Sequence, residues 1–396
     1  MTTSESAAPP PSGLSVFLLA LASFASASAF RIVDPLLPHL AREFAVSTGS
    51  ASRAVTVFAI AYGIAQFLYG PLGDRIGKYR TITAATLLCS IGSIGAAFAP
   101  SLDMLIVCRI LSGAAGAGIM PLALAWLGDR VPYERRQATL ARFLLGSITG
   151  IAGGQLISGM FADTLGWRAG FVFLGLVYLA AGGALLLFRP ARPDLPPSGP
   201  RPHVFAALGT LFRVRWARVV LATGFMEGAI VFGILAFVPN YLQQRFGVSA
   251  TLAGMTGAMF ALGGYVYVGS ARRLVPRLGE AGMAAGAALS LCVVFLVFLG
   301  APSWTLTLPA ALLSGFGYYL LHSTLQTNAT QMAPQVRGTA VSMFASFLFT
   351  GQSVGVWTVA QIDGALGMPW AFALAAVLMP AVALAFRHAL LNRRRS

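Results

Sequence analysis

Charged residues are scarce in this sequence. Only 10% of its 396 residues are Asp, Glu, Lys or Arg, whereas 57% are hydrophobic. A soluble domain carries about 25% charged residues, so this composition excludes a surface that is exposed to water on all sides. The mean hydropathy of +0.76 agrees with that exclusion. The sequence therefore predicts an integral membrane protein.

Other signatures of function are also missing. The three cysteines lie in apolar segments and show neither a disulfide framework nor a metal-ligand spacing. No phosphate-binding loop of the Walker type occurs, and no nucleophile constellation is visible. The first twelve residues lack the basic segment that begins a cleavable signal peptide. We therefore expect no cofactor, no metal and no enzymatic activity.

Basic residues are in excess, and their positions explain why. The net charge is +15, but the basic residues fall mostly in the gaps between apolar segments rather than in a stripe with interleaved aromatics. With the N-terminus in the cytoplasm, 21 basic residues lie on the cytoplasmic side and 4 on the other. The positive-inside rule favours this orientation. We expect a multi-pass protein of the inner (plasma) membrane with both termini in the cytoplasm and no nucleic-acid partner.

Apolar segments that could span a bilayer recur about twelve times, since a spanning helix needs about 20 such residues. The predicted fold class is an all-α membrane protein with twelve transmembrane helices in two pseudo-symmetric six-helix bundles. The expected organisation is a disordered N-terminus (1–12), an N-terminal bundle (13–188), a proline-rich cytoplasmic linker (189–216), a C-terminal bundle (217–387) and a basic tail (388–396). The segments lie near 13–39, 52–72, 80–99, 103–127, 137–160, 168–188, 217–240, 252–271, 281–300, 304–328, 338–361 and 369–387.

The two halves of the sequence resemble each other. Residues 129–139 parallel residues 333–339, and residues 166–171 parallel residues 367–372. Such internal pseudo-symmetry is typical of transporters that are built from two repeated bundles.

A polar stretch, Gly-Pro-Leu-Gly-Asp-Arg-Ile-Gly-Lys-Tyr-Arg at 70–80, separates the second and third apolar segments. Its glycines allow a sharp turn, and Asp74 can accept hydrogen bonds from helix N-termini. The pattern resembles the signature loop of the major facilitator superfamily, a large family of secondary transporters. The resemblance implies a conformational latch formed by Gly70, Gly73, Asp74, Arg75, Gly77 and Lys78.

Two further stretches resemble signatures of the same family. Arg109, followed by glycines in the fourth segment, resembles the second signature, in which the arginine is linked to proton coupling; alternatively, Arg109 reaches the outer interface. The fifth segment, 146–156, resembles the antiporter signature, but Thr149-Gly150 stands in place of its Gly-Pro pair. Small residues at this spacing also serve close helix packing, so the direction of transport stays open.

Charges inside the membrane are costly and are functional candidates by default. Arg31 and Asp34 share a helix face at i, i+3; the alternative is that Asp34 lies solvated at the outer rim. Glu227 falls near mid-bilayer in the seventh segment, where burial disfavours the charged form and suits a proton carrier. The alternative for Glu227 is a structural hydrogen bond to a neighbouring helix.

His322 and Gln326 share a face of the tenth segment, and a histidine there could titrate near neutral pH or simply pack. We expect one polar pocket between the two halves, with Glu227 accessible from it. The candidate proton-coupling or substrate-binding residues are Asp34, Arg31, Arg109, Glu227, His322 and Gln326.

The resemblance implies a monomeric exporter of the drug:proton antiporter group in the lipid bilayer. It would move a small amphipathic or cationic organic molecule by alternating access, driven by protons. One alternative is a proton-coupled importer of a sugar, an organic acid or an amino acid. A second alternative is a lipid translocator or a membrane receptor that does not transport.

Overall fold

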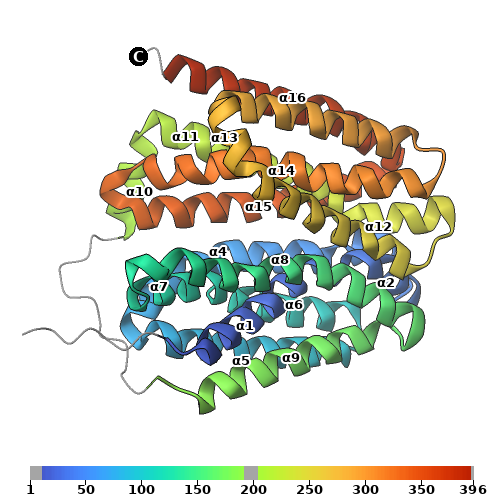
Figure 1. Ribbon diagram of the computed structural model, residues 1–396. Helices are drawn as coiled ribbons and strands as arrows, with labels where there is room; N and C mark the ends of the chain where they lie inside the picture. The colour runs from blue at the N-terminus through green and yellow to red at the C-terminus, as the bar shows by residue number, and fades with distance from the viewer. Residues whose placement is uncertain (1–10, 191–203, 394–396) are drawn as a thin grey trace, which may run out of the picture.

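The computed structural model describes residues 11–190 and 204–393, and every regular element in these ranges is helical (Figure 1). Nearly all of the expected disordered N-terminus, half of the expected linker and the end of the basic tail lie outside the described residues. Within the expected linker, the structure contains a helix at Val204–Arg213. The fold is an all-α membrane protein, as the sequence predicts.

The helices of the first half follow the apolar segments. The elements are α1 (Gly13–Arg31), η1 (Asp34–Leu36), α2 (Leu37–Glu43), α3 (Thr48–Ala51), α4 (Arg53–Ile76), α5 (Lys78–Ala97), α6 (Leu102–Gly116), α7 (Ile119–Arg130), α8 (Tyr133–Thr164) and α9 (Trp167–Leu187). Several membrane crossings are therefore made of two helices in series, such as α1 with α2 and α6 with α7.

The second half repeats this arrangement. The elements are α10 (Val204–Arg213), α11 (Arg215–Glu227), η2 (Gly228–Phe232), α12 (Gly233–Phe246), α13 (Ala250–Gly300), η3 (Trp304–Leu306), α14 (Thr307–Gln331), η4 (Pro334–Val336), α15 (Arg337–Leu366) and α16 (Met368–Arg393). Helix α13 changes direction at Gly279, whose φ is +62°, so its 51 residues cross the bilayer twice.

Ten helical segments of the described chain are long and apolar enough to cross a membrane. Because α13 supplies two crossings and α14 is a further helix of 25 residues, the described chain forms the twelve crossings of the predicted fold. Figure 1 shows the two halves as two layers, blue to green and yellow to red. They meet along two seams, where α8 packs on α13 and α4 packs on α15.

The signature stretch 70–80 is almost entirely helical and is not an extended loop. Helix α4 continues to Ile76 in spite of Pro71, and α5 begins at Lys78. Only Gly77 interrupts the helices, with a φ of +102° that a residue with a side chain rarely adopts. The turn is therefore tighter than the expected gap between 72 and 80.

Glycines bring α8 against α1 at backbone contact distance. A Cβ on Gly146, Gly150 or Gly154 would lie 2.2 to 2.5 Å from a carbonyl oxygen of α1. The spacing of four residues keeps these glycines on one helix face. Close packing of this kind is how small residues hold membrane helices together, and it explains the glycine-rich fifth segment structurally.

The matching contact in the second half contains an irregularity. A Cβ on Gly351 or Gly355 of α15 would lie 2.0 or 1.9 Å from a carbonyl oxygen of the seventh crossing. On that crossing, Gly228 and Gly233 are five residues apart, and both face α15. A π-helical turn, η2, accommodates the extra residue and keeps both glycines on the same face.

The two ends of the molecule differ. At one end, called the closed end, the carboxylate of Asp163 in α8 accepts hydrogen bonds from the backbone N–H groups of Ala250 and Thr251 in α13, at 3.0 and 2.8 Å. The Nε2 atom of Gln243 donates to the carbonyl oxygen of Pro35 across the same end, at 2.9 Å. These bonds join the two halves.

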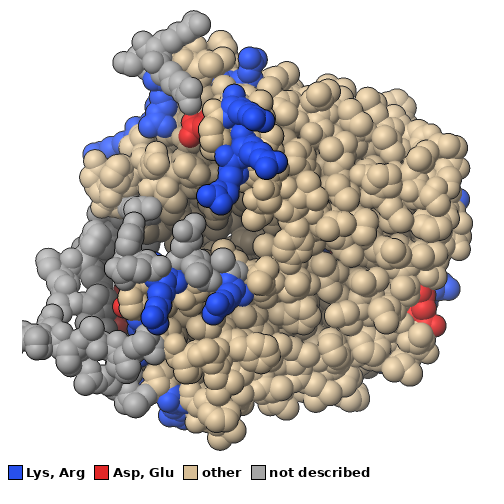
Figure 2. All heavy atoms as spheres, in the orientation of Figure 1, with Lys and Arg blue, Asp and Glu red and all other residues tan. Residues whose placement is uncertain are grey.

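The opposite end, called the linker end, is where α1 begins, α9 ends and α11 begins. Figure 2 shows a hollow between the two layers toward this end, with Lys and Arg side chains near it. The described hydrogen bonds between the halves run from the closed end to the middle of α4, where Ser346 donates to the carbonyl oxygen of Gly63 at 2.8 Å. The structure is thus closed at one end and open at the linker end.

Candidate functional site

Asp34 lies in the short turn η1, where Pro35 ends the regular α-helical hydrogen bonding of the first crossing. The side chain is fully buried, so the alternative of a solvated rim position does not hold. Its Oδ2 atom accepts hydrogen bonds from Nη1 of Arg31 at 3.2 Å and from Nε2 of Gln155 at 2.7 Å. Its Oδ1 atom has no hydrogen-bond partner among the described residues.

Arg109 is held by backbone groups inside the first half. It is 1% exposed, and it donates to the carbonyl oxygens of Ala54 at 3.1 Å and Ala29 at 2.8 Å. Its guanidinium also lies 3.9 Å from the ring centre of Phe58. Arg109 therefore does not reach the outer interface, but joins α6 to α1 and α4 as a fixed buried cation.

Arg31 faces the other half of the molecule. Its guanidinium lies 4.5 Å from the ring centre of Phe232, which belongs to the π turn η2. A small pocket between the halves, called the seam pocket, adjoins Arg31. Its lining residues are Arg31, Ile151, Gln155, Leu235, Thr256, Gly257 and Phe260.

The second half holds its own buried acid. Oε2 of Glu227 lies 2.9 Å from Nδ1 of His322 in α14, and Oε1 has no partner among the described residues. Glu227 itself is fully buried, so it is not directly accessible from a pocket in this conformation, contrary to our expectation. The exposed member of the pair is His322, whose side chain is 13% exposed.

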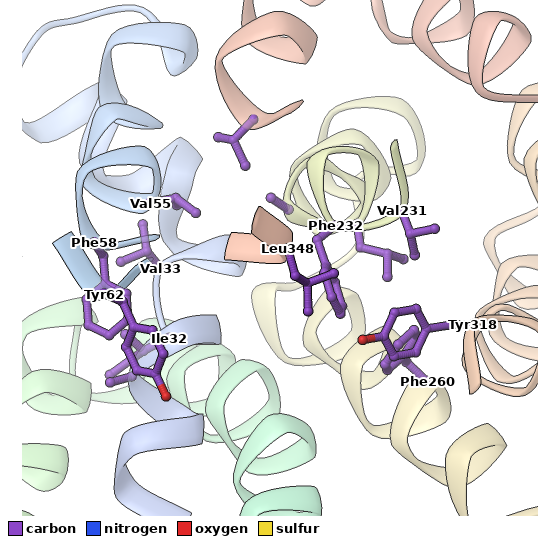
Figure 3. Close-up of a cluster of buried hydrophobic side chains, with 14 of the residues drawn as sticks. Ile32, Val33, Val55, Phe58, Tyr62, Val231, Phe232, Phe260, Tyr318 and Leu348 are labelled. Carbon is purple, nitrogen blue, oxygen red and sulfur yellow. The ribbon is translucent and has the colours of Figure 1, made fainter. Parts of the chain in front are cut away.

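Aromatic rings connect the two acids. The ring of Tyr318 stacks on His322 at a centroid distance of 4.7 Å and lies 4.9 Å from the ring of Phe232. Figure 3 shows Phe232, Tyr318 and Phe260 close together on the side of the second half. A continuous path of contacts thus runs from Asp34 through Arg31, Phe232, Tyr318 and His322 to Glu227.

Gln326 is not part of this path. Its side chain is exposed on α14, one turn from His322 toward the linker end. Sequence analysis also missed Gln155, which donates to Asp34 from within the glycine-rich stripe of α8. The signal was an amide side chain in an otherwise small and apolar helix segment, where a polar group needs a partner.

The signature residues lie away from the site, on the linker side. Asp74 is half-buried in the last turns of α4, and Lys78 forms an ion pair with Asp129 of α7 in the same half. Gly73 packs tightly on Leu122, where a Cβ would come within 2.6 Å of a side-chain carbon. A latch between the two halves at these residues stays a prediction.

Comparison with known proteins gives one consistent result. The Major Facilitator Superfamily matches residues 19–356 of the chain. The 4-hydroxybenzoate transporter PcaK of Pseudomonas putida is 26% identical over 87% of this chain and 85% of its own length. The inner membrane transport protein YnfM of Escherichia coli is 27% identical over 60% of this chain, and the match spans 55% of that relative.

Solved structures agree on the fold. A POT family transporter in complex with 5-aminolevulinic acid superposes with a TM-score of 0.78 at 13% identity, over 96% of this chain and 97% of the other. A bacterial homologue of the human lysosomal transporter Spinster gives a TM-score of 0.72 at 17% identity, over 94% and 95% of the two chains. With twelve crossings in two repeated halves and a family match over most of its length, the chain is a multi-pass membrane transporter of the Major Facilitator Superfamily.

Proposed function

We propose that this chain is a proton-coupled secondary transporter that moves a small amphipathic organic molecule by alternating access of its two halves. The observation that carries the proposal is the contact path between two fully buried acids, Asp34 and Glu227, one in each half. Buried acids in a membrane protein are costly, and acids that are retained there are functional candidates. Because this path of contacts crosses the seam between the halves, protonation of either acid would change the electrostatic contacts that hold the two halves together.

The orientation follows from charge. We propose that the linker end faces the cytoplasm of a cell whose inner membrane holds the protein, because the basic residues gather there. The structure then represents an inward-open conformation, with Asp163 and its partners sealing the outer side. We further propose that the chain works as a monomer, since each half supplies part of the site.

The first candidate direction is export, in the manner of drug:proton antiporters. The glycine-rich stripe of α8 supports it through its resemblance to the antiporter signature, although the same glycines pack α8 on α1. A cationic substrate is less favoured by the geometry than an uncharged or anionic one. Each acid already lies beside a basic side chain of its own half, Arg31 for Asp34 and His322 for Glu227.

The second candidate is proton-coupled import of an organic acid. The specific observation in its favour is Arg31, a buried cation beside the seam pocket. The relative PcaK is by name a 4-hydroxybenzoate transporter, so transport of an organic acid is found among similar chains. Sugars, amino acids and lipids lack a comparable observation in the part of the chain that the structure describes.

The signature residues lie at the linker end, away from the buried acids, and would act on the conformational change of the transport cycle rather than on the substrate. In the present conformation, Lys78 is paired within its own half and the linker end is open. We propose that Asp74 engages the second half when this end closes, and thereby holds the outward-open state. Charge and helix-dipole contacts of this kind contribute about 0.3–1 kcal/mol each.

The experiment is transport in sealed proteoliposomes with an imposed pH gradient, on the wild type and on Glu227→Gln. We expect the gradient to drive flux of a substrate found by screening, and Glu227→Gln to lose that flux while keeping exchange of substrate at equal pH. The matched control is Asp363→Asn, a carboxylate outside the contact path. Wild-type flux that ignores the pH gradient would show that the transporter is not driven by protons.

A further inference from the structure

A pocket larger than the seam pocket lies at the linker end of the first half. Helices α1 and α8 lie side by side there (Figure 1), and they meet where a Cβ on Gly146 would come within 2.2 Å of the carbonyl oxygen of Ala20. Toward the linker end α1 begins at Gly13, whereas α8 begins further away, at Tyr133. Between these two helix ends lies a pocket of about 450 Å³, called the α1–α8 pocket.

Two arginines of α8 line this pocket. Arg135 and Arg142 are seven residues apart, and Thr139 lies between them on the same helix face. Both arginine side chains are exposed, and neither guanidinium has an ion-pair or hydrogen-bond partner among the residues that the structure describes. The hydroxyl of Thr139 already donates to the carbonyl oxygen of Arg135 at 3.0 Å. The pocket therefore presents two positive charges whose N–H donors are available to a ligand.

The positive-inside rule alone explains some arginines at this end, but it does not explain their concentration on α8. The first ten residues of α8 contain Arg135, Arg136 and Arg142, whereas α15, the counterpart of α8 in the second half, has Arg337 as its only basic residue. Arg136 is already satisfied, because its Nη2 donates to the carbonyl oxygen of Val131 at 3.3 Å. Arg135 and Arg142 are thus the two arginines of this cluster that favour a bound anion.

The side of the pocket that α1 forms is apolar. Val16, Phe17 and Ala20 line it, and the side chain of Phe17 is 61% exposed. The apolar spans of α1 and α8 begin at Gly13 and Arg142. The pocket therefore lies at the boundary between lipid headgroups and the hydrocarbon core, with positive charge on one wall and an apolar surface on the other.

We propose that the α1–α8 pocket binds an anionic phospholipid. Its phosphodiester lies between Arg135 and Arg142, and the beginning of its acyl chains lies against Val16 and Phe17. Guanidinium groups hold phosphate oxygens through charge-assisted hydrogen bonds. Basic pockets between transmembrane helices bind lipid headgroups on the cytoplasmic side, which is the side that we propose for this end of the molecule.

The shape of the pocket favours a phospholipid over a free phosphate ion. A free ion would contact the arginines alone and leave Phe17 exposed, whereas a phospholipid contacts both walls. Every lining residue of the pocket belongs to the first half. The lipid therefore stays bound while the two halves move against each other, and it holds the first half at a fixed depth in the bilayer.

The test measures lipid binding to the full-length protein in detergent, by native mass spectrometry and by thermal unfolding. The probes are dioleoylphosphatidylglycerol, which is anionic, dioleoylphosphatidylcholine, which is zwitterionic, and inorganic phosphate, which has no acyl chains. We expect the phosphatidylglycerol to bind more tightly than the phosphatidylcholine. It should also raise the unfolding temperature, because a ligand that binds only the folded protein stabilises it. Inorganic phosphate at the same concentration should do neither.

Removing both arginines tests the charged wall. Arg135→Gln combined with Arg142→Gln should weaken phosphatidylglycerol binding about 25-fold, since each basic residue near an anionic lipid contributes about a factor of five. The matched control is Arg80→Gln combined with Arg213→Gln, which removes the same charge from exposed arginines near the linker end but outside the pocket. This control should bind phosphatidylglycerol as the wild type does. An equal loss in both double variants would overturn the inference, because the attraction would then come from the overall charge of this end.

Phe17→Ser tests the apolar wall and separates a lipid from a free anion. Because Phe17 is exposed, the lipid-free variant should unfold at the temperature of the wild type, while its binding of phosphatidylglycerol weakens about fivefold through lost apolar contact. The control is Phe188→Ser, an exposed phenylalanine of the same half at the linker end, which should bind as the wild type. Stabilisation by inorganic phosphate that equals stabilisation by phosphatidylglycerol, or lipid binding that Phe17→Ser leaves unchanged, would show that the pocket is an anion site and not a lipid site.

Discussion

The first half of the molecule buries one acid with two arginines, whereas the second half buries one acid with a single histidine. The basic side chains of the first half are both guanidinium groups, which are strongly basic. The second half has a histidine in their place, a side chain that is not permanently charged. The pseudo-symmetric halves thus share an architecture but differ in electrostatics.

This difference in the basic side chains beside each buried acid suggests a different function for each half. In the first half, Arg109 is fixed by backbone carbonyls, and Arg31 is the cation with donors to spare. In the second half, Glu227 lies 2.9 Å from Nδ1 of His322, and none of the described arginines is paired with it. We therefore propose that the first half holds a charged ligand and that the second half responds to pH.

The largest expected effect is on stability. Asp34→Leu leaves Arg31 buried without its carboxylate, and breaking a buried ion pair in this way costs about 3–5 kcal/mol. Glu227→Leu removes a single hydrogen bond to His322, so the loss should be nearer about 1–2 kcal/mol. Thermal unfolding of both variants in one detergent near neutral pH measures the difference.

A rescue variant sharpens this comparison. Replacing Arg31 and Asp34 together by leucine removes both charges, which is often nearly neutral when a buried pair is replaced by apolar residues. We expect the double variant to recover most of the stability that Asp34→Leu loses. Equal losses for Asp34→Leu and Glu227→Leu would mean that the two halves are electrostatically alike after all.

The glycine contacts offer a second comparison between the halves. Gly150→Ala and Gly355→Ala each place a Cβ within 2.3 Å of a backbone oxygen on the neighbouring helix. Overpacking of this kind costs about 1–3 kcal/mol, so both variants should unfold at lower temperature. Gly364→Ala in α15 is the control, because a Cβ there meets nothing within 4 Å and should be neutral or slightly stabilising.

The π turn η2 makes this comparison informative. It lies directly against the α15 glycines of the second half, whereas α8 and α1 meet as regular helices. If the turn can shift along the helix, Gly355→Ala will cost clearly less than Gly150→Ala. Losses of similar size would show that the π turn is held as rigidly as the regular helices.

The sequence was sufficient for the fold, because long apolar segments and their basic gaps leave little choice of architecture in a bilayer. It also singled out Asp34, Arg109 and Glu227, since any buried charge in such segments stands out. It could not say which way Glu227 points. Where every helix face is apolar, periodicity does not distinguish a face toward the pocket from one toward a neighbouring helix.

Other features depend on contacts between distant segments. The place of Gln155 beside Asp34 requires α8 to cross α1 at one particular height, which only tertiary packing decides. The π turn follows from a five-residue spacing between Gly228 and Gly233 that has meaning only against α15. The hydrogen bond between Asp163 and α13 joins residues from different halves. Nothing in the sequence near either residue indicates that the other one is its partner.

The smallest expected effect concerns the closed end, where the halves are joined by Asp163. Its carboxylate accepts three hydrogen bonds from α13, two from backbone N–H groups and one from the hydroxyl of Thr251 at 2.6 Å. Asp163→Asn removes the charge and keeps one acceptor oxygen, so we expect a loss of about 1 kcal/mol. That loss corresponds to about a fivefold rise in the population that is open at this end.

Spin labels on Leu165 and Leu306 report this change, because both side chains are exposed and belong to different halves. The control is Asp103→Asn, which removes a carboxylate from the first turn of α6 at the same end but within one half. The distance distribution should broaden toward longer distances in Asp163→Asn and stay unchanged in Asp103→Asn. Identical distributions in all three proteins would mean that the closed end is held by helix packing along the seams, and that the three hydrogen bonds merely accompany it.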